Sequence, residues 1–188
     1  MRIRFCLIYS LNENRIYLID NVLNLKDPRI AILPEKKLIG RRQKMSLADN
    51  KTKELWRSFM PYRREVKEPI SEDLYSVQVY EKILDFKKFD LYTEFTKWAA
   101  LEVRHLKDIP AEMETLTIPA GLYAVFVHRG DFTAFKETFD YIFFGWLPNS
   151  GFEIDGRPHF EILGEKYRND HPDSEEEVWI PIRAKARA

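Results

Sequence analysis

The spacing of apolar residues predicts two amphipathic helices. In residues 132–147, apolar side chains recur every three or four positions and follow Asp131, a residue type that commonly caps the first turn of a helix. A shorter segment, Asn50 to Met60, places Trp56 and Phe59 on one helical face. A proline, which cannot continue a helix, closes each segment. We therefore expect one helix in each half of the chain.

Other segments have the alternation that is typical of strands. Single residues separate Tyr75, Val77 and Val79, and Glu161 stands between Phe160 and Ile162. A period of two is typical of a strand with one buried face. These segments therefore predict strands after each helix.

The two halves of the chain also repeat one another. Residues 55–61 (LWRSFMP) align with residues 142–148 (IFFGWLP), apolar with apolar at most positions, and other blocks recur in the same order. Each half reads strand, helix, strand, strand between about Glu35 and Arg183. We predict an α+β fold in which these tandem repeats form one antiparallel, concave sheet with two helices on one face.

The last strand of each half assigns residues to the two faces of this sheet. Alternation places Ala99 and Ile180 toward the helices, and Trp98 and Trp179 on the opposite face. We expect the opposite face to be left open, with both tryptophans exposed on it.

The first 33 residues lie outside the repeat. They include a strand-like segment, Arg15 to Ile19, and an apolar one, Val22 to Leu25. We interpret residues 1–33 as an N-terminal extension, either an added strand or a flexible segment, and residues 34–188 as one domain that folds without it.

Composition narrows the possible partners. The 188 residues are 45% apolar and 14% aromatic, and 30 basic residues balance 30 acidic ones. A net charge of zero disfavours direct binding to nucleic acid or to an anionic membrane. The single cysteine, Cys6, and the absence of a signal-peptide pattern favour the cytoplasm. The oligomeric state stays open.

Common catalytic, cofactor and metal signatures are missing from the sequence, so no cofactor and no metal are expected. His159 beside Glu161 supplies half of a metal site at most, since no second histidine stands nearby. The acidic run Glu175 to Glu177 is interpreted as a solvated start of a strand.

One strand suggests a binding site. Its alternation assigns Phe160 to the core and leaves Glu161 for the open face, among Trp98 and Trp179. A carboxylate among aromatic rings suits a lipophilic cation, because both groups attract positive charge. The simpler interpretation, a solvent-exposed glutamate beside core tryptophans, stays open.

Further candidates depend on the strand register. Gly164 often marks a bulge in such a position, so Glu165 is an alternative cleft carboxylate. Tyr80, Tyr123 and Phe126 could complete an aromatic wall.

Several of these motifs together resemble the GyrI-like small-molecule-binding family, the effector-binding domain of AraC-type regulators. They are residues 118–130 (IPAGLYAVFVHRG), 146–151 (WLPNSG), Phe160-Glu161 and 167–182 (YRNDHPDSEEEVWIPI). The resemblance implies a ligand cleft between the two halves. It also implies that a cleft glutamate and aromatic residues bind hydrophobic, often cationic, compounds.

Relatives of this kind include gyrase inhibitors and hydrolases that open cyclopropane-containing toxins with glutamate and tyrosine. The family's Glu-x-Tyr pattern is matched by Glu165 and Tyr167, and its Phe-Glu pattern by Glu161. The roughly 33 preceding residues are too few for a pair of helix-turn-helix motifs, so we expect a stand-alone binding domain related to transcription regulators. Hydrolysis of a strained toxin and gyrase inhibition are the alternatives, with an enzyme less favoured than a multidrug-type binder.

Overall fold

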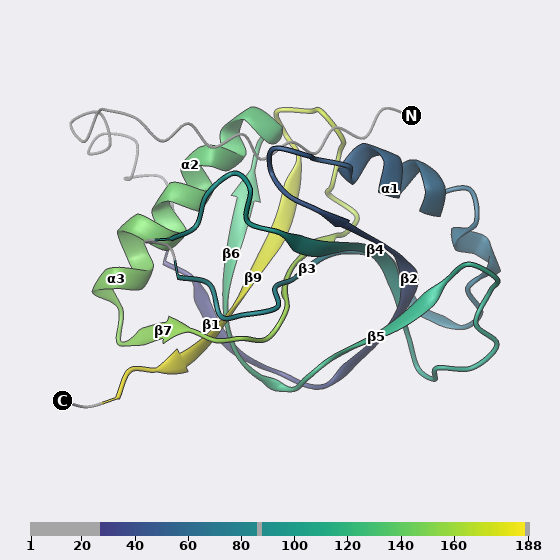
Figure 1. Ribbon diagram of the computed structural model, residues 1–188, viewed down its shortest axis with the longest axis horizontal. Helices are drawn as coiled ribbons and strands as arrows, with labels where there is room; N and C mark the ends of the chain where they lie inside the picture. Colours follow the sequence, from purple (N-terminus) through teal and green to yellow (C-terminus); the bar gives the residue numbers. More distant parts are fainter. Residues whose placement is uncertain (1–26, 86–87, 187–188) are drawn as a thin grey trace.

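The computed structural model describes residues 27–85 and 88–186. Its centre is a strongly curled antiparallel sheet with the strand order β1-β6-β9-β8-β3-β4-β2-β5, to which β7 is added beside β9 (Figure 1). The strands are β1 (Arg29–Leu33), β2 (Lys36–Met45), β3 (Pro69–Val79), β4 (Phe95–Val103), β5 (Glu114–Ile118), β6 (Gly121–Arg129), β7 (Phe152–Ile154), β8 (His159–Leu163) and β9 (Glu175–Ala184).

The predicted repeat is present. The first unit is β2, α1 (Thr52–Phe59), β3 and β4, with a short 3-10 turn, η2 (Arg63–Glu65), after α1. The second unit is β6, a helical segment, β8 and β9. Both helical parts lie on the same side of the sheet (Figure 1), which confirms the predicted α+β class. Strands β1 and β5 precede the first strand of each unit and pair across the units, β1 with β6 and β5 with β2. Strand β7 is an addition to the second unit.

The second helical segment is continuous but not uniform. It consists of η3 (Phe132–Ala134), α2 (Phe135–Asp140), the π-helical η4 (Tyr141–Trp146) and α3 (Leu147–Asn149). Oδ1 of Asp131 accepts a hydrogen bond from the amide of Thr133 at 2.9 Å, as expected of a capping residue. Gly130, at φ +115°, makes the turn from β6 into this segment, a conformation that disfavours side chains.

The face opposite the helices is buried, so the expectation of an open face is wrong. Along the pairing of β4, β3, β8 and β9, Trp98 lies opposite Val77, Val77 opposite Phe160, and Phe160 opposite Trp179. The sheet curls around this row and closes it into an inner core. Its buried members are Leu33, Leu38, Tyr75, Val77, Trp98, Ala100, Ile118, Tyr123, Val125, Phe160 and Trp179.

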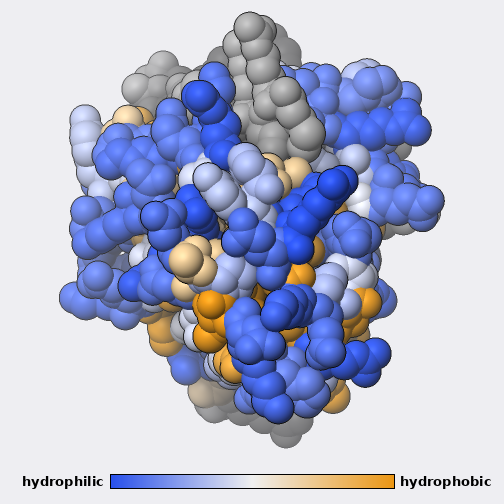
Figure 2. All heavy atoms as spheres, turned by 90° about the vertical axis from the view of Figure 1, so that its right-hand side faces the viewer, coloured by the Kyte–Doolittle hydropathy of each residue, from blue (hydrophilic) through white to orange (hydrophobic). Residues whose placement is uncertain are grey.

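The helix-facing side of the sheet carries two further clusters. One packs β2 and β4 against α1 through Trp56 and Phe59, and the other packs β6 and β9 against the second helical segment through Phe139 and Ile142. Strands β8 and β3 lie between the two clusters in the sheet. On the face shown in Figure 2 most of the surface is hydrophilic, and hydrophobic residues gather in its lower half.

Part of the proposed N-terminal extension belongs to the sheet. Residues Arg29–Leu33 form β1 and pair with β6, and Leu33 is buried in the inner core. These five residues of the proposed extension are thus a strand of the sheet. Arg15 to Ile19 and Val22 to Leu25 lie outside the described residues.

Candidate functional site

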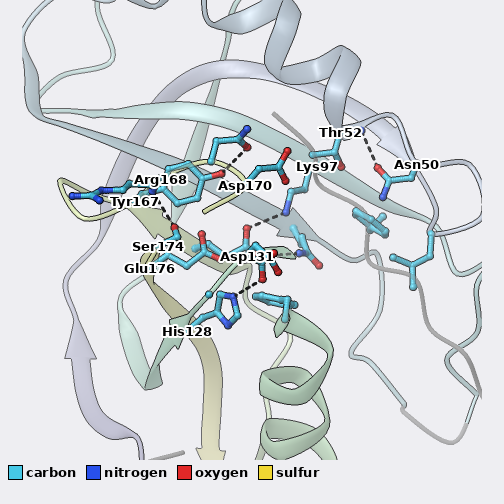
Figure 3. A pocket seen from close by; sticks show the side chains of 17 residues that line it. Asn50, Thr52, Lys97, His128, Asp131, Tyr167, Arg168, Asp170, Ser174 and Glu176 are labelled. Atoms are coloured by element: carbon cyan, nitrogen blue, oxygen red, sulfur yellow. Dashed lines mark hydrogen bonds and ion pairs between the residues drawn. The ribbon is translucent and has the colours of Figure 1, made fainter. Parts of the chain in front are cut away.

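Buried polar side chains lie on the helix-facing side of the sheet, in the gap between the two clusters. Strand pairing places His128 of β6 opposite Glu176 of β9, and Gln78 of β3 opposite Lys97 of β4. Glu161 of β8 stands between these pairs, opposite Val178. Figure 3 shows Lys97, His128 and Glu176 converging from their separate strands.

Glu161 is the most central of these groups. Its side chain is 6% exposed, and Oε2 lies 3.3 Å from Nζ of Lys97, whose side chain is 4% exposed. The amide of Gln78 donates a longer hydrogen bond of 3.4 Å to Oε1. A carboxylate removed from water needs such partners, because desolvation without them costs several kcal/mol. This cost is comparable to the whole free energy of unfolding of a typical domain.

Glu176 is the second buried carboxyl group. It is 7% exposed, and its Oε2 has no hydrogen-bond partner among the described residues. Burial raises the pKa of Glu176 to about 8, and the nearby charge of Glu161 adds to this, while Lys97 opposes it. Glu176 is therefore mainly protonated at neutral pH in the empty protein.

His128 adds a neutral imidazole beside this carboxyl group. Nδ1 lies 2.8 Å from the hydroxyl of Thr138, and Nε2 lies 3.3 Å from the carbonyl oxygen of Asp131. Burial lowers the pKa of His128. The side chain thus joins β6 to α2 without adding a second positive charge near neutral pH.

These groups form the floor of a pocket, called here the polar pocket (Figure 3). It contains about 660 Å³ of space, the open solvent at its mouth included. The loop before β9 makes one rim and is held by two hydrogen bonds of Ser174, from the amides of Gly130 and Arg168. The lining residues are Leu47, Asn50, Thr52, Gln78, Phe95, Lys97, His128, Gly130, Asp131, Phe135, Glu161, Tyr167, Arg168, Asn169, Asp170, Ser174 and Glu176.

A second, largely apolar pocket adjoins it and is called here the aromatic pocket. Gln78, Phe135 and Glu161 line both pockets. The rest of the aromatic pocket comes from Tyr80, Leu84, Phe89, Phe139, Ile142, Phe143, His159, Phe160, Val178 and Ile180. Glu161 therefore stands where a polar and an aromatic compartment meet.

His159 is an uncharged part of the aromatic wall. Its ring lies 5.4 Å from the ring of Tyr80 and 6.4 Å from that of Phe143. Burial lowers the pKa of His159 to about 3, with a small opposing effect of Asp155. Within the described residues, no group of three or more His, Cys, Asp or Glu side chains is placed to hold a metal ion.

Two of the seven predicted site residues line these pockets. Glu161 lines both, and Tyr80 lines the aromatic pocket, where its hydroxyl donates to Oε1 of Gln78 at 2.9 Å. Glu165 is exposed in the turn after β8. Phe126 points toward the helices but packs between Tyr141 and Trp146.

The other three belong to the inner core. Trp98 and Trp179 are 5% and 7% exposed, and Tyr123 is fully buried, with its hydroxyl donating to the carbonyl of Pro158 at 3.1 Å. The expectation that Glu161 shares a face with the tryptophans is wrong. Phe160, not Glu161, lies opposite Trp179, so the carboxylate points to the helix side.

The sequence prediction missed Lys97, Gln78, His128 and Glu176. Lys97 had a signal, because it occupies a helix-facing position of β4 in alternation with Phe95 and Ala99. Glu176 belongs to the acidic run that we interpreted as the solvated start of a strand. In the structure it shares the buried face of β9 with Val178.

The fold and its pocket define a two-repeat domain with a pocket lined by residues of both halves. Residues 26–183 match the family described as the GyrI-like small molecule binding domain. The chain therefore belongs to this family, as its sequence motifs suggested, and it is a small-molecule binding domain.

Three proteins similar to this chain are a transcriptional regulator, a protein with a bound ligand and a hydrolase. The chain is 32% identical over 90 residues to the transcriptional regulator BrlR of Pseudomonas aeruginosa, a match that covers 47% of this chain and 33% of the regulator. It thus spans about a third of that relative. The structure of SAV2435 bound to tetraphenylphosphonium has a TM-score of 0.61 at 14% identity and covers 84% of this chain and 94% of that one.

The third is the structure of a hydrolase encoded by lin2189 from Listeria innocua. It has a TM-score of 0.53 at 14% identity and covers 88% of this chain and 96% of that one. At such identities, the two structures establish the common fold.

Among the helices of the described residues, none combines the length and the apolarity needed to cross a bilayer.

Proposed function

We propose that this domain binds small molecules with an apolar body and a cationic group, in the cleft formed by the polar and aromatic pockets. The observation that carries this proposal is the position of Glu161. Its carboxylate is buried at the junction of the two pockets, where a ligand could place its charge near the acidic groups and its rings among aromatic side chains.

The physical chemistry of the cleft supports this ligand class. Burial in the aromatic pocket favours an apolar body by roughly 25 cal/mol for each Å² removed from water. A ring face attracts a cation by about 0.5–2 kcal/mol, and a desolvated carboxylate adds to this attraction. The tetraphenylphosphonium bound to SAV2435 is a compound of this kind and further supports the proposal.

Two ions of the same shape and opposite charge test the proposal. Tetraphenylphosphonium should bind and raise the melting temperature, whereas tetraphenylborate should bind at least tenfold more weakly, as titration calorimetry would measure. Glu161→Gln leaves the ammonium of Lys97 in the pocket without its carboxylate, so cation affinity should fall by about 1–3 kcal/mol. The control is Glu165→Gln, which removes an exposed carboxylate outside both pockets. Equal binding of both ions would overturn the proposal.

The biological use proposed for this binding is sensing or sequestration of such compounds in the cytoplasm. The similarity to BrlR, a transcriptional regulator, supports a sensing role. A panel of chemically unrelated lipophilic cations would test whether the domain is a multidrug binder: a broad response supports it, and a response to one compound contradicts it.

A second candidate function is hydrolysis of a strained, cyclopropane-containing toxin. The observation that favours it is a hydrogen-bonded series in which Tyr80 donates to Gln78 and Gln78 donates to Glu161. Burial raises the pKa of Tyr80 well above its usual range, so the phenol stays protonated and could donate a hydrogen bond to a substrate. Mass spectrometry would decide between the functions, because an enzyme releases many product molecules per protein and a binder releases none.

A further inference from the structure

We propose that Glu176 is the second acidic group of the binding site, and that it gains its counter-ion from a cationic ligand while releasing one proton to solvent. This inference rests on the proposed binding function and identifies the residue whose negative charge neutralises the charge of the ligand. The reaction balances in atoms and charge: the ligand keeps its charge, the Glu176 carboxyl group becomes a carboxylate, and the buffer takes the proton.

Glu161 alone does not provide a net negative charge. Its Oε2 already lies 3.3 Å from the ammonium of Lys97, and both side chains are almost fully buried. A cation that approaches Glu161 therefore meets a carboxylate and an ammonium at similar range, whose effects on it largely cancel. The pocket needs a further acidic group to favour a cation strongly.

Glu176 meets this need in position and in hydrogen bonding. Its neighbour on the same face of β9, Val178, lies opposite Glu161, so the two acidic side chains are diagonal neighbours on adjacent strands. Oε2 of Glu176 is buried without a hydrogen-bond partner among the described residues, and the side chain lines the polar pocket. An unsatisfied carboxyl oxygen at the wall of a pocket is available to a ligand.

The groups around Glu176 determine its charge when the pocket is empty. Neutral His128 faces it from β6, Glu161 faces it from β8, and Lys97 reaches toward both acids from β4. The adjacent turn after β6 contributes Asp131, and the loop before β9 contributes Tyr167, Arg168 and Asp170 to the same pocket.

The balance of these groups keeps the proton on Glu176. Burial and the charge of Glu161 raise its pKa to about 8, and Lys97, already paired with Glu161, reduces the shift without abolishing it. A permanent cation in the pocket would reverse this balance, because it stabilises the ionised carboxylate at close range.

Calorimetric titration with tetraphenylphosphonium tests the inference, since this ligand has no proton to exchange. At pH 7, titrations in phosphate and in Tris, whose ionisation enthalpies differ, should show release of nearly one proton per ligand. Affinity should rise by about tenfold per pH unit between pH 6 and pH 7.5 and level off above pH 8. Proton release should be nearly absent at pH 9.

Glu176→Gln keeps the shape of the side chain and removes its ionisation. This variant should bind the cation without proton release and with an affinity that is independent of pH, and at pH 9 its affinity should be at least tenfold below that of the parent. Glu165→Gln, an exposed carboxylate on the neighbouring turn, should behave as the parent does. Circular dichroism would verify that each variant is folded.

The outcomes separate the two proposals. Binding by the parent protein without proton release, or undiminished release in Glu176→Gln, overturns this inference and leaves the proposed function in place. Failure of the parent to bind tetraphenylphosphonium at any pH between 6 and 9 overturns both. The pH profile of the parent decides the matter even where the variant does not fold.

Discussion

Glu161 and Trp179 lie on adjacent, hydrogen-bonded strands but on opposite faces of the sheet. In the pairing of β8 with β9, Trp179 stands opposite Phe160, and Glu161 stands opposite Val178. Because side chains alternate along a strand, this register sends the indole into the inner core and the carboxylate into the cleft. The aromatic rings available to a ligand are therefore those on the helix side, such as Phe135 and Phe143.

Trp179 should matter for stability and Phe135 for binding. Trp179→Leu removes a ring that stacks on Phe160 at 5.4 Å, so we expect the free energy of unfolding to fall by about 2–3 kcal/mol. Its affinity for tetraphenylphosphonium should stay within twofold of the parent. Phe135→Leu, at a position that lines both pockets, should show the reverse, with weaker binding and a smaller loss of stability. Denaturant unfolding and calorimetry measure the two effects. Weaker binding by Trp179→Leu alone would place the ligand in the inner core.

Lys97 should oppose cation binding while stabilising the empty protein. Lys97→Met removes the partner of Glu161, and breaking a buried ion pair in this way costs about 3–5 kcal/mol. A bound cation would then take the place of the ammonium, so affinity for tetraphenylphosphonium should rise by about tenfold or more. Thermal shifts with ligand should accordingly be larger in the variant than in the parent.

A second ion pair provides the matched control for this prediction. Nζ of Lys36 lies 2.7 Å from Oε2 of Glu102, and both side chains are mostly buried but line neither pocket. Lys36→Met should lower stability and leave cation affinity unchanged. If both lysine variants gained affinity equally, general electrostatics rather than the position of Lys97 would be responsible.

His159 should make the empty protein less stable in acid. Burial holds its folded-state pKa at about 3, below the unfolded value of about 6.5. Between these values the unfolded chain binds a proton that the folded protein does not, so stability falls as the pH drops below 6.5. The slope is about 1.4 kcal/mol per pH unit for one such group. Glu176, whose pKa is raised, contributes a slope of opposite sign between about pH 4.5 and 8, so variants must be compared with the parent.

Urea unfolding between pH 4.5 and 6 measures this slope. His159→Phe should reduce the dependence of stability on pH by about 1.4 kcal/mol per unit relative to the parent. Tyr80→Phe changes packing against the same ring without removing a group that titrates in acid, so its slope should match the parent's. An unchanged slope in His159→Phe would show that the imidazole is not held neutral by the fold.

Much of the fold could be predicted because the apolar pattern repeats. The aligned segments 55–61 and 142–148 end both helical parts, and alternation around Tyr75 and Phe160 located β3 and β8. The short strand β7 has no counterpart in the first unit, so comparison of the halves could not reveal it. Strands β1 and β5 do correspond to one another, but their sequences, RIAIL and ETLTI, are too different for the comparison to align them. The concave sheet was predicted, but the filling of its concave face by a core was not, since that core includes Leu33 and Ile118 from strands that the sequence did not reveal.

The site could be predicted only in part, for a physical reason. Glu161 stood out as a carboxylate in an apolar strand, but both faces of that strand are buried, and alternation alone does not say which face is the cleft. Glu176 became visible only through strand pairing. Its neighbours Glu175 and Glu177 are less buried and form surface ion pairs, and they made the whole run look solvated.

Two adjacent residues of β1 can be used to test whether this strand belongs to the minimal domain, because they point to opposite faces of the strand. Leu33 is 2% exposed in the inner core, whereas Ile32 is 82% exposed on the other face of the strand. We expect Leu33→Ala to lower the free energy of unfolding by about 2–4 kcal/mol and Ile32→Ala to change it by less than about 0.5 kcal/mol. A chain that begins at Pro34 lacks both residues. It should still unfold cooperatively, because β6 stays paired with β9, but at a lower denaturant concentration. Loss of cooperative unfolding in this shorter chain would show that β1 belongs to the minimal domain, and equal effects of the two alanine variants would contradict the register.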